Sequence, residues 1–294
     1  MALVLLAAAT GWWRLAVRPD GARVTRASTA TPGFSAALPS PAPPAAPPSP
    51  SRPEASPEAA RITLPLRTEA DVTAAVQRFL AAGFPVRCGG ANEPVVALTF
   101  EDGPGPNTVW AARLLERRGA GATSFFNGVA LDAFSSAIPA ALRVGEVGNH
   151  GWSHMGLVGA DPDLLTAEMD MLQARLAELA GTPPRLFRPP HGALDEAVLD
   201  RARSLGMLTV LSTVDVNDAE AAGEAVVWAA MQRGARPGAI LTMRENEEVT
   251  RTLLPDLLDL LEQRGLHPVT VSELLAIDPP TREQLREGTC PVAA

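Results

Sequence analysis

Short apolar runs and longer amphipathic segments alternate along the sequence from residue 68 onward. The apolar runs predict strands, which we place at residues 95–100, 122–126, 146–147, 185–187, 207–211, 239–242 and 269–271. Apolar residues at helical spacing predict helices over residues 68–82, 108–118, 164–180, 195–205, 221–233 and 250–264. Regular alternation of this kind indicates a parallel sheet, and about seven strands fit a closed or partly closed α/β barrel better than a short open sheet.

Polar clusters follow several of these strands. In chain order the first three are Glu101-Asp102-Gly103-Pro104, the stretch from Gly148 to His154, and the stretch from Arg188 to His191. In parallel barrels the catalytic groups gather at the carboxyl ends of the strands. We therefore expect these clusters to meet in one site.

The first cluster places two acids side by side. Consecutive side chains of a strand point to opposite faces, so Glu101 and Asp102 can serve one centre only if the strand ends there. Gly103-Pro104 provides that end. An isolated Glu-Asp-Gly-Pro sequence is also typical of exposed acids that cap the next helix, but the histidine pair downstream favours a site.

The second cluster contains two histidines four residues apart. On a helical turn or a tight loop His150 and His154 can face the same point, and Asp102 completes a set of two histidines and one carboxylate. Such a set binds zinc or a related divalent ion and leaves coordination positions open. The alternative is one histidine in a core hydrogen bond and the other on the surface.

The motifs, in this order, resemble those of the polysaccharide deacetylases, the NodB-homology domains of carbohydrate esterase family four. The resemblance runs from about Val95 to about Leu275. It implies a distorted (β/α) barrel with about seven parallel strands. In the family the second acid and the two histidines bind the metal, which implies that Asp102, His150 and His154 hold a divalent metal here, zinc in the first place or cobalt or another transition metal.

The resemblance also implies catalytic roles. Glu101 stands where the family has an aspartate as general base; it is one methylene longer, and a displacement on the order of 1 Å can cost about a hundredfold in rate. Arg188 matches the arginine that orients the base, and Asp215 the acid that tunes a catalytic histidine. Pro190 and His191 lie on the substrate side, where His191 replaces a tyrosine whose backbone N–H helps to hold the oxyanion.

The largest departure from the family concerns the histidine that protonates the leaving amine. Arg244 occupies its position, or Met243 if the register slips by one, and a permanently charged arginine is a poor proton donor. We hypothesise that Arg244 pairs with Asp215 and contacts substrate. Ala219 stands where a tryptophan walls the acetyl pocket, and His267 is expected on the surface at the opposite end of the barrel.

Three functions remain open on this basis. The first is an exported metal-dependent hydrolase that removes N-acetyl groups from an acetylated polysaccharide such as peptidoglycan or chitin. The second is a catalytically impaired relative that binds glycan or a protein partner. The third is a hydrolase retuned for esters, whose leaving alcohols need less help from an acid.

Composition limits the partners and divides the chain. The formal net charge of -8, without an Arg-rich run, argues against a nucleic-acid partner. An apolar start and a Pro-, Ala- and Ser-rich stretch favour export to the cell envelope or the exterior. The expected divisions are a signal or membrane-anchor segment at 1–30, a linker at 31–59, an N-terminal extension at 60–92, the deacetylase-like domain at 93–277 and a tail at 278–294.

The chain has two cysteines, Cys88 and Cys290, on either side of this domain. Neither is next to a histidine, so we do not expect them to bind zinc. In an exported chain they can form one disulfide that ties the ends of the domain together. Two unrelated thiols are the alternative.

Overall fold

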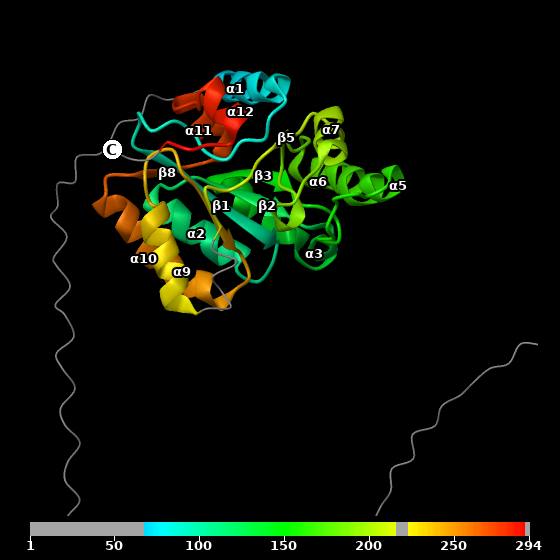
Figure 1. Ribbon diagram of the computed structural model, residues 1–294. Helices are drawn as coiled ribbons and strands as arrows, with labels where there is room; N and C mark the ends of the chain where they lie inside the picture. Colours follow the sequence, from blue (N-terminus) through cyan, green and yellow to red (C-terminus); the bar gives the residue numbers. More distant parts are fainter. Residues whose placement is uncertain (1–67, 216–222, 292–294) are drawn as a thin grey trace, which may run out of the picture. The chain divides into compact units, whose positions relative to one another are not determined.

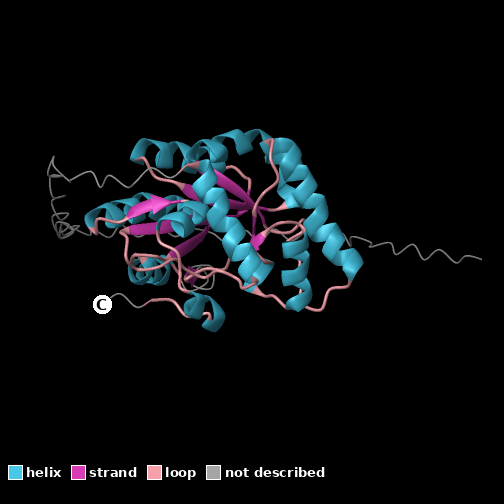
Figure 2. Ribbon diagram, turned by 90° about the horizontal axis from the view of Figure 1, so that it is seen from above, coloured by secondary structure: helices cyan, strands magenta, loops and turns pink. Residues whose placement is uncertain are grey.

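The computed structural model describes residues 68–215 and 223–291. The predicted signal or anchor segment, the linker and residues 216–222 lie outside the described residues. No helix within the two described ranges has the length and hydrophobicity needed to cross a membrane. In these ranges the strands form the centre and helices surround them, as Figures 1 and 2 show.

Within the described residues, the sheet contains eight parallel strands. Seven follow the order β5-β4-β3-β2-β1-β7-β6, and β8 pairs with β1. Their bounds are β1 (Val95–Gly103), β2 (Ala122–Phe126), β3 (Gly145–Asn149), β4 (Leu186–Phe187), β5 (Leu208–Thr209), β6 (Val214–Asp215), β7 (Ile240–Arg244) and β8 (His267–Val269). The curled parallel sheet confirms the expected distorted (β/α) barrel.

Strand β1 shows how alternation builds the two sides of the barrel. Val96, Leu98 and Phe100 pack into the apolar layer beneath the outer helices, whereas Val95 and Ala97 belong to a second cluster inside the sheet. The inward face continues with Thr99 and then Glu101. The alternation therefore carries Glu101 to the inner rim of the barrel, where the site lies.

A short extended piece, residues 86–89, joins the β5 edge of the sheet to the start of β7. We call it the closing segment. Val86 bridges Val210 beyond β5, and Cys88 bridges Ala239 just before β7. Backbone hydrogen bonds of 2.7 to 2.9 Å join this segment to Thr209 and Leu211 on the β5 side and to Gly238 before β7. Cys88 is joined to Cys290 by a disulfide, so the bonded alternative for the two cysteines is the one found.

The helices pack around this sheet. Their bounds are α1 (Glu69–Ala82), α2 (Thr108–Arg118), α3 (Gly128–Phe134), α4 (Ile138–Val144), α5 (Pro162–Leu165), α6 (Met171–Ala180), α7 (Glu196–Ser204), α9 (Glu224–Gly234), α10 (Glu248–Gln263), α11 (Val271–Ile277) and α12 (Arg282–Glu287). The sequence predicted a single helix over 164–180, but a π-helical turn at Thr166–Asp170 separates α5 from α6.

The last strand also differs from its prediction. It spans His267–Val269, and α11 begins at Val271. A capping box explains the boundary: the Thr270 hydroxyl accepts from the Glu273 amide, and the Glu273 carboxylate accepts from the Thr270 amide. His267 is half-buried and pairs with Val95 at the amino end of β1, so its predicted end of the barrel is right and its predicted exposure is too high.

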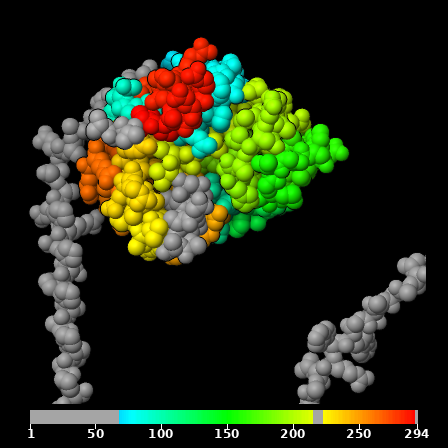
Figure 3. Space-filling view, in the orientation of Figure 1, coloured from blue at the N-terminus to red at the C-terminus, as the bar shows by residue number. Residues whose placement is uncertain are grey.

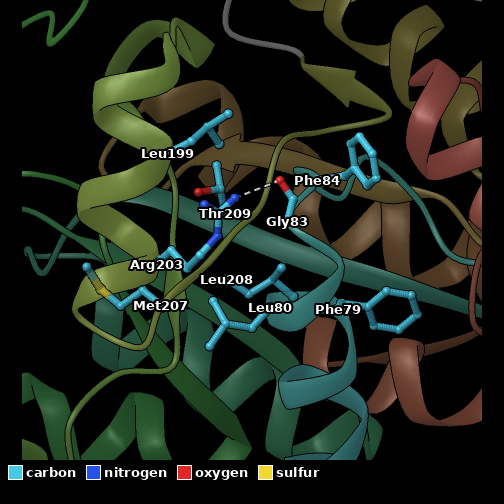
Figure 4. A pocket seen from close by; sticks show the side chains of 9 residues that line it. All are labelled: Phe79, Leu80, Gly83, Phe84, Leu199, Arg203, Met207, Leu208 and Thr209. Atoms are coloured by element: carbon cyan, nitrogen blue, oxygen red, sulfur yellow. Dashed lines mark hydrogen bonds between the residues drawn. The ribbon is translucent and has the colours of Figure 1, made fainter.

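Segments from both described ends of the chain share one side of the structure. Helix α1 packs against α11, and Figure 3 shows the red C-terminal residues beside the cyan residues of α1. Figure 4 shows the contact of α1 with α7, where the Arg203 guanidinium donates to the carbonyl of Gly83, the residue that caps α1, at 3.0 Å. The pocket drawn there is small, and none of its lining residues belongs to the predicted site.

Candidate metal centre

The carboxyl ends of the strands bring the predicted polar clusters together. The acid pair ends β1, the first histidine follows β3, Arg188 follows β4, and Arg244 ends β7 in register with Glu101. Met243 is buried in the apolar layer beneath the outer helices. Of the two positions that the sequence left open, Arg244 is therefore the one at the rim of the barrel.

The end of β1 turns both acids towards the rim. Asp102 has a positive φ of 63°, and the pairing with β2 shifts register between Glu101 and Gly103. The Asn246 side chain donates to the Asp102 carbonyl at 3.1 Å. Glycine is required next, because a Cβ at Gly103 would lie 1.8 Å from the carboxylate of Glu245. This break in the alternation allows adjacent acids to serve one centre.

Asp102, His150 and His154 form a compact donor set. Asp102 Oδ1 lies 3.7 Å from His150 Nε2 and 3.3 Å from His154 Nε2, and one donor atom from each residue lies within 4.8 Å of the others. Ligands about 2.1 Å from a tetrahedral ion are about 3.4 Å apart. The spacing therefore fits a divalent cation.

The tautomer of His150 also fits metal binding. Its Nδ1 lies 2.8 Å from the Arg188 carbonyl, which can only accept, so Nδ1 carries the hydrogen. Burial lowers the pKa of His150 to about 3, which keeps the ring neutral. Its Nε2 is buried and has no hydrogen-bond partner among the described residues. An unprotonated nitrogen left in this way towards a carboxylate is a metal-ligand arrangement.

His154 occupies the more open side of the set. A quarter of its side chain is exposed, and its φ is 62°. The ring of His191 stands against it nearly edge-on, with centroids 4.6 Å apart. His191 is exposed and follows the buried Pro190 in a single turn of 3-10 helix. The substrate-side residues predicted from the sequence thus lie next to the metal-ligand set.

Arg188 is buried beside Glu101. One guanidinium nitrogen donates to the hydroxyls of Thr99 and Thr242 at 2.9 and 2.8 Å, and lies 3.5 Å from Glu101 Oε2. The guanidinium also stacks 4.3 Å above the Phe125 ring. The sequence analysis missed both threonines, although each lies two residues before a predicted site residue and so shares its face of the strand.

Arg244 makes a contact that the sequence did not predict. Its Nε lies 3.2 Å from Asp102 Oδ2, whereas the two histidines contact Oδ1. The predicted partner, Asp215, lies in β6 with its backbone in register with Thr242. The side chain of Asp215, like Ala219, lies outside the described part of the chain.

Two buried glutamates near the rim were also missed. Glu245 accepts from the Thr108 hydroxyl at 2.7 Å, and burial raises the pKa of its carboxyl to about 7. Glu168, in the π-helical turn, accepts from Ser153. Glu245 could have been noticed as the neighbour of Arg244. Glu168 gave no signal, because its position reads as ordinary helix.

Comparison with known proteins identifies the fold family. The polysaccharide deacetylase family model matches residues 89–210. A peptidoglycan-N-acetylglucosamine deacetylase of Bacillus cereus is 32% identical over 192 residues, which cover 63% of this chain and 89% of that protein. The chain belongs to the polysaccharide deacetylase family.

Other members of the family differ in size and in activity. A chitin deacetylase of Pestalotiopsis sp is 28% identical over 187 residues, and the matched part spans 63% of that protein. Among solved structures, a mutant of a Bacillus anthracis pseudoenzyme of the same carbohydrate esterase family, with restored enzymatic activity, has a TM-score of 0.60 at 25% identity, covering 65% of this chain and 71% of the other. The family thus includes both deacetylases and a pseudoenzyme.

Proposed function

We propose that the chain is a metal-dependent hydrolase that removes N-acetyl groups from a peptidoglycan- or chitin-like polysaccharide, and so cleaves a carbon–nitrogen bond other than a peptide bond. The observation that carries the proposal is the donor set of Asp102, His150 and His154, in which a buried His150 nitrogen has no hydrogen-bond partner among the described residues. Family membership supports the substrate class.

Asp102, His150 and His154 would hold a divalent ion, zinc in the first place, with cobalt or another transition metal as alternatives. Such an ion supplies Lewis acidity, which lowers the pKa of a water molecule and polarises a carbonyl. The donor set keeps its own geometry through the hydrogen bond from His150 Nδ1 to the Arg188 carbonyl. The cation would therefore meet ligands that are already oriented.

Glu101 is the proposed general base, which would take the proton of the attacking water on Oε2. That oxygen lies 4.0 Å from His150 Nε2, so it borders the proposed cation site. Arg188 orients the carboxylate and is itself fixed by two threonine hydroxyls. The glutamate is one methylene longer than the aspartate of the family, and the curved end of β1 is where the extra length must be accommodated.

The open side of the site would contact the sugar. Pro190 and His191 form one wall, with the turn that would offer a backbone N–H to the oxyanion. Arg244 stands where the family protonates the leaving amine. It stabilises negative charge but does not release a proton at neutral pH. Asp215 matches the acid that tunes the catalytic histidine in the family, and it would act next to Arg244 from the neighbouring strand β6.

A second function is favoured by one specific contact. Arg244 pairs with Oδ2 of Asp102, and a guanidinium at this place neutralises a proposed ligand instead of donating a proton. A pseudoenzyme belongs to the same family. The second candidate is thus a catalytically impaired relative that binds an acetylated glycan or a protein partner.

We also propose where the protein acts and how its chain is divided. The apolar start, the Pro-rich stretch and the disulfide favour the cell envelope or the exterior, either secreted or anchored at the N-terminus. The partner is an acetylated polysaccharide and not a nucleic acid. Residues 93–277 would form the catalytic domain, with the extension at 60–92 and the tail at 278–294 attached to it.

The test measures metal binding and acetate release on the same full-length protein. After chelation the chain is titrated with Zn²⁺ and Co²⁺, and acetate release is followed from chitooligosaccharides and from acetylated peptidoglycan. Asp102→Asn is the matched variant, because asparagine tolerates the positive φ. Stoichiometric metal and acetate release, both lost in Asp102→Asn, support the hydrolase. Metal without acetate release, together with glycan binding, supports the second candidate; no metal overturns the metal-dependent hydrolase.

A further inference from the structure

We propose that Glu168 is a positioning residue of the metal centre, which fixes the loop between His150 and His154 so that both Nε2 atoms face Asp102. The proposal rests on the metal site of the proposed function. It concerns a side chain that lies outside the recognised motifs and belongs to the π-helical turn Thr166–Asp170.

Glu168 accepts two hydrogen bonds from Ser153, the residue directly before the second histidine. Its Oε2 accepts from the Ser153 backbone N–H at 2.8 Å, and its Oε1 accepts from the Ser153 hydroxyl at 2.6 Å. Glu168 is 5% exposed, and no arginine or histidine pairs with it within residues 68–215 and 223–291. A buried carboxylate held mainly by two hydrogen bonds to one loop residue constrains that residue strongly.

Met169, the next residue of the π-helical turn, is hydrogen-bonded to Asn149, the residue directly before the first histidine. The side-chain Nδ2 of Asn149 donates to the Met169 carbonyl at 2.9 Å, and its side-chain Oδ1 accepts from the Gly151 N–H at 3.0 Å. Glu168 and Met169 are adjacent. Each ligand histidine therefore directly follows a residue that is tied to this turn.

The π-helical geometry explains how one turn makes both contacts. A π turn carries one extra residue and is frequent at functional sites. Its outer side is fixed to α7, where Arg201 donates to the Asp170 carboxylate at 2.7 Å. The turn thus stands between a rigid helix and the histidine loop, and supporting hydrogen bonds of this type keep metal ligands in their binding geometry.

The molecule contains a matched control. Glu146, at the amino end of β3, accepts from the Ser272 N–H at 3.0 Å and from the Ser272 hydroxyl at 2.7 Å. The two contacts with serine are the same in kind as those between Glu168 and Ser153, and Glu146 accepts in addition from the Thr123 hydroxyl at 3.0 Å. Ser272 belongs to α11, however, at the end of the barrel opposite to the metal-ligand set. A change at Glu146 reports the structural cost of losing such a pair without touching the site.

The experiment compares Glu168→Gln with Glu146→Gln in the full-length chain. Glutamine keeps the shape but removes the negative charge, so the two charge-assisted hydrogen bonds to Ser153 become weaker neutral ones. Glu168→Gln is expected to weaken Co²⁺ binding by about 10- to 100-fold and to change the visible spectrum of the bound Co²⁺, whereas Glu146→Gln leaves both as in the wild type. Ser153→Ala, which keeps the backbone N–H, should give a smaller change in the same direction.

A metal-free measurement separates this inference from the proposed function. In the chelated protein, amide exchange of the segment 151–154 should be about tenfold or more faster in Glu168→Gln and unchanged in Glu146→Gln. Unchanged exchange, or unchanged Co²⁺ affinity and spectrum in Glu168→Gln, overturns the positioning role. A wild type that binds no metal overturns the proposed function, and the exchange result then still decides whether Glu168 orders the loop.

Discussion

The site has two halves that hold their charges in different ways. The buried half consists of Glu101, His150 and Arg188, which are exposed by 7%, 1% and 3%. The open half consists of Asp102, His154, His191 and Arg244, and the side chains of Asp102, His154 and Arg244 are exposed by 27%, 25% and 35%. Hydrogen bonds from the strands fix the buried half, whereas solvent reaches the open half.

This difference accounts for where the chain departs from its family motifs. In the buried half the one departure is Glu101, which still places a carboxylate beside Arg188. Losing that carboxylate would leave a buried charge without its partner, which destabilises a fold strongly. In the open half His191 and Arg244 replace residues of different chemistry. Solvent tolerates such changes at little cost in stability. The open half can therefore change its reaction while the buried half conserves its charges.

The largest expected effect separates the two proposed histidine ligands. His150→Ala and His154→Ala should each weaken Zn²⁺ binding by more than about 100-fold, beyond the range of residues that only support a ligand. Only His150→Ala should also lower the unfolding temperature of the chelated protein, because it leaves a buried cavity and the Arg188 carbonyl without its donor. Equilibrium dialysis and calorimetry measure the two quantities. Equal losses of stability would contradict the division into halves.

The next effect concerns the chemistry of the open half. Arg244→His returns a group that can protonate the leaving amine, and acetate release is expected to rise by about 100- to 10,000-fold if the rest of the site is intact. Adding Glu101→Asp should raise it further. Initial rates on a chitooligosaccharide at equal bound metal give the comparison. Identical rates in all variants would favour the glycan- or partner-binding alternative.

Arg188 and Arg244 should differ in how much each contributes to the free energy of unfolding. Arg188→Met removes the guanidinium next to the buried Glu101 carboxylate and should lower the free energy of unfolding by about 3–5 kcal/mol. Arg244→Met, in the open half, should change it by less than about 1 kcal/mol. Urea denaturation of the chelated proteins measures both. The comparison fails if Arg244→Met is the more damaging change.

The smallest effect tests a buried acid beneath the open half. Burial raises the pKa of Glu245 to about 7 from an ordinary value of 4.5, so the folded chain holds this proton more tightly than the unfolded chain. The resulting stability is fully present below pH of about 4.5 and is lost as the pH rises through about 7.

The wild type should therefore lose on the order of 3 kcal/mol relative to Glu245→Gln between pH 4.5 and pH 8. Urea denaturation across this pH range measures the loss. Glu262→Gln, at a largely exposed position, is the control and should follow the wild type. Parallel pH profiles of Glu245→Gln and the wild type would show that Glu245 titrates normally.

The sequence was sufficient for the parts of the fold whose signal is local. The apolar run from Val95 to Phe100 marked β1, which in the structure extends to Gly103, and the segment from Thr108 to Arg118 was predicted with the bounds it has. Strand β6 has only two residues and α3 only seven, which is too short for a periodic signal. The order of the strands and the role of the closing segment depend on contacts between distant residues, and no local pattern contains them.

In the site, too, the sequence predicted local motifs but not contacts between distant residues. The acid pair and the histidine pair were recognisable as motifs, and the structure brings Asp102, His150 and His154 together. The contact between Arg244 and Asp102 depends on how far β7 extends beside β1. The contribution of Glu168 depends on a π turn that the apolar pattern does not distinguish from α-helix.

The closing segment has a consequence for biosynthesis. Cys88 precedes β1, and Cys290 follows β8, 202 residues later. A ribosome must therefore have made every strand of the sheet before the two sulfurs can meet. A chain interrupted before its last strand therefore has no partner for Cys88, and the disulfide can form only after the whole sheet has been made.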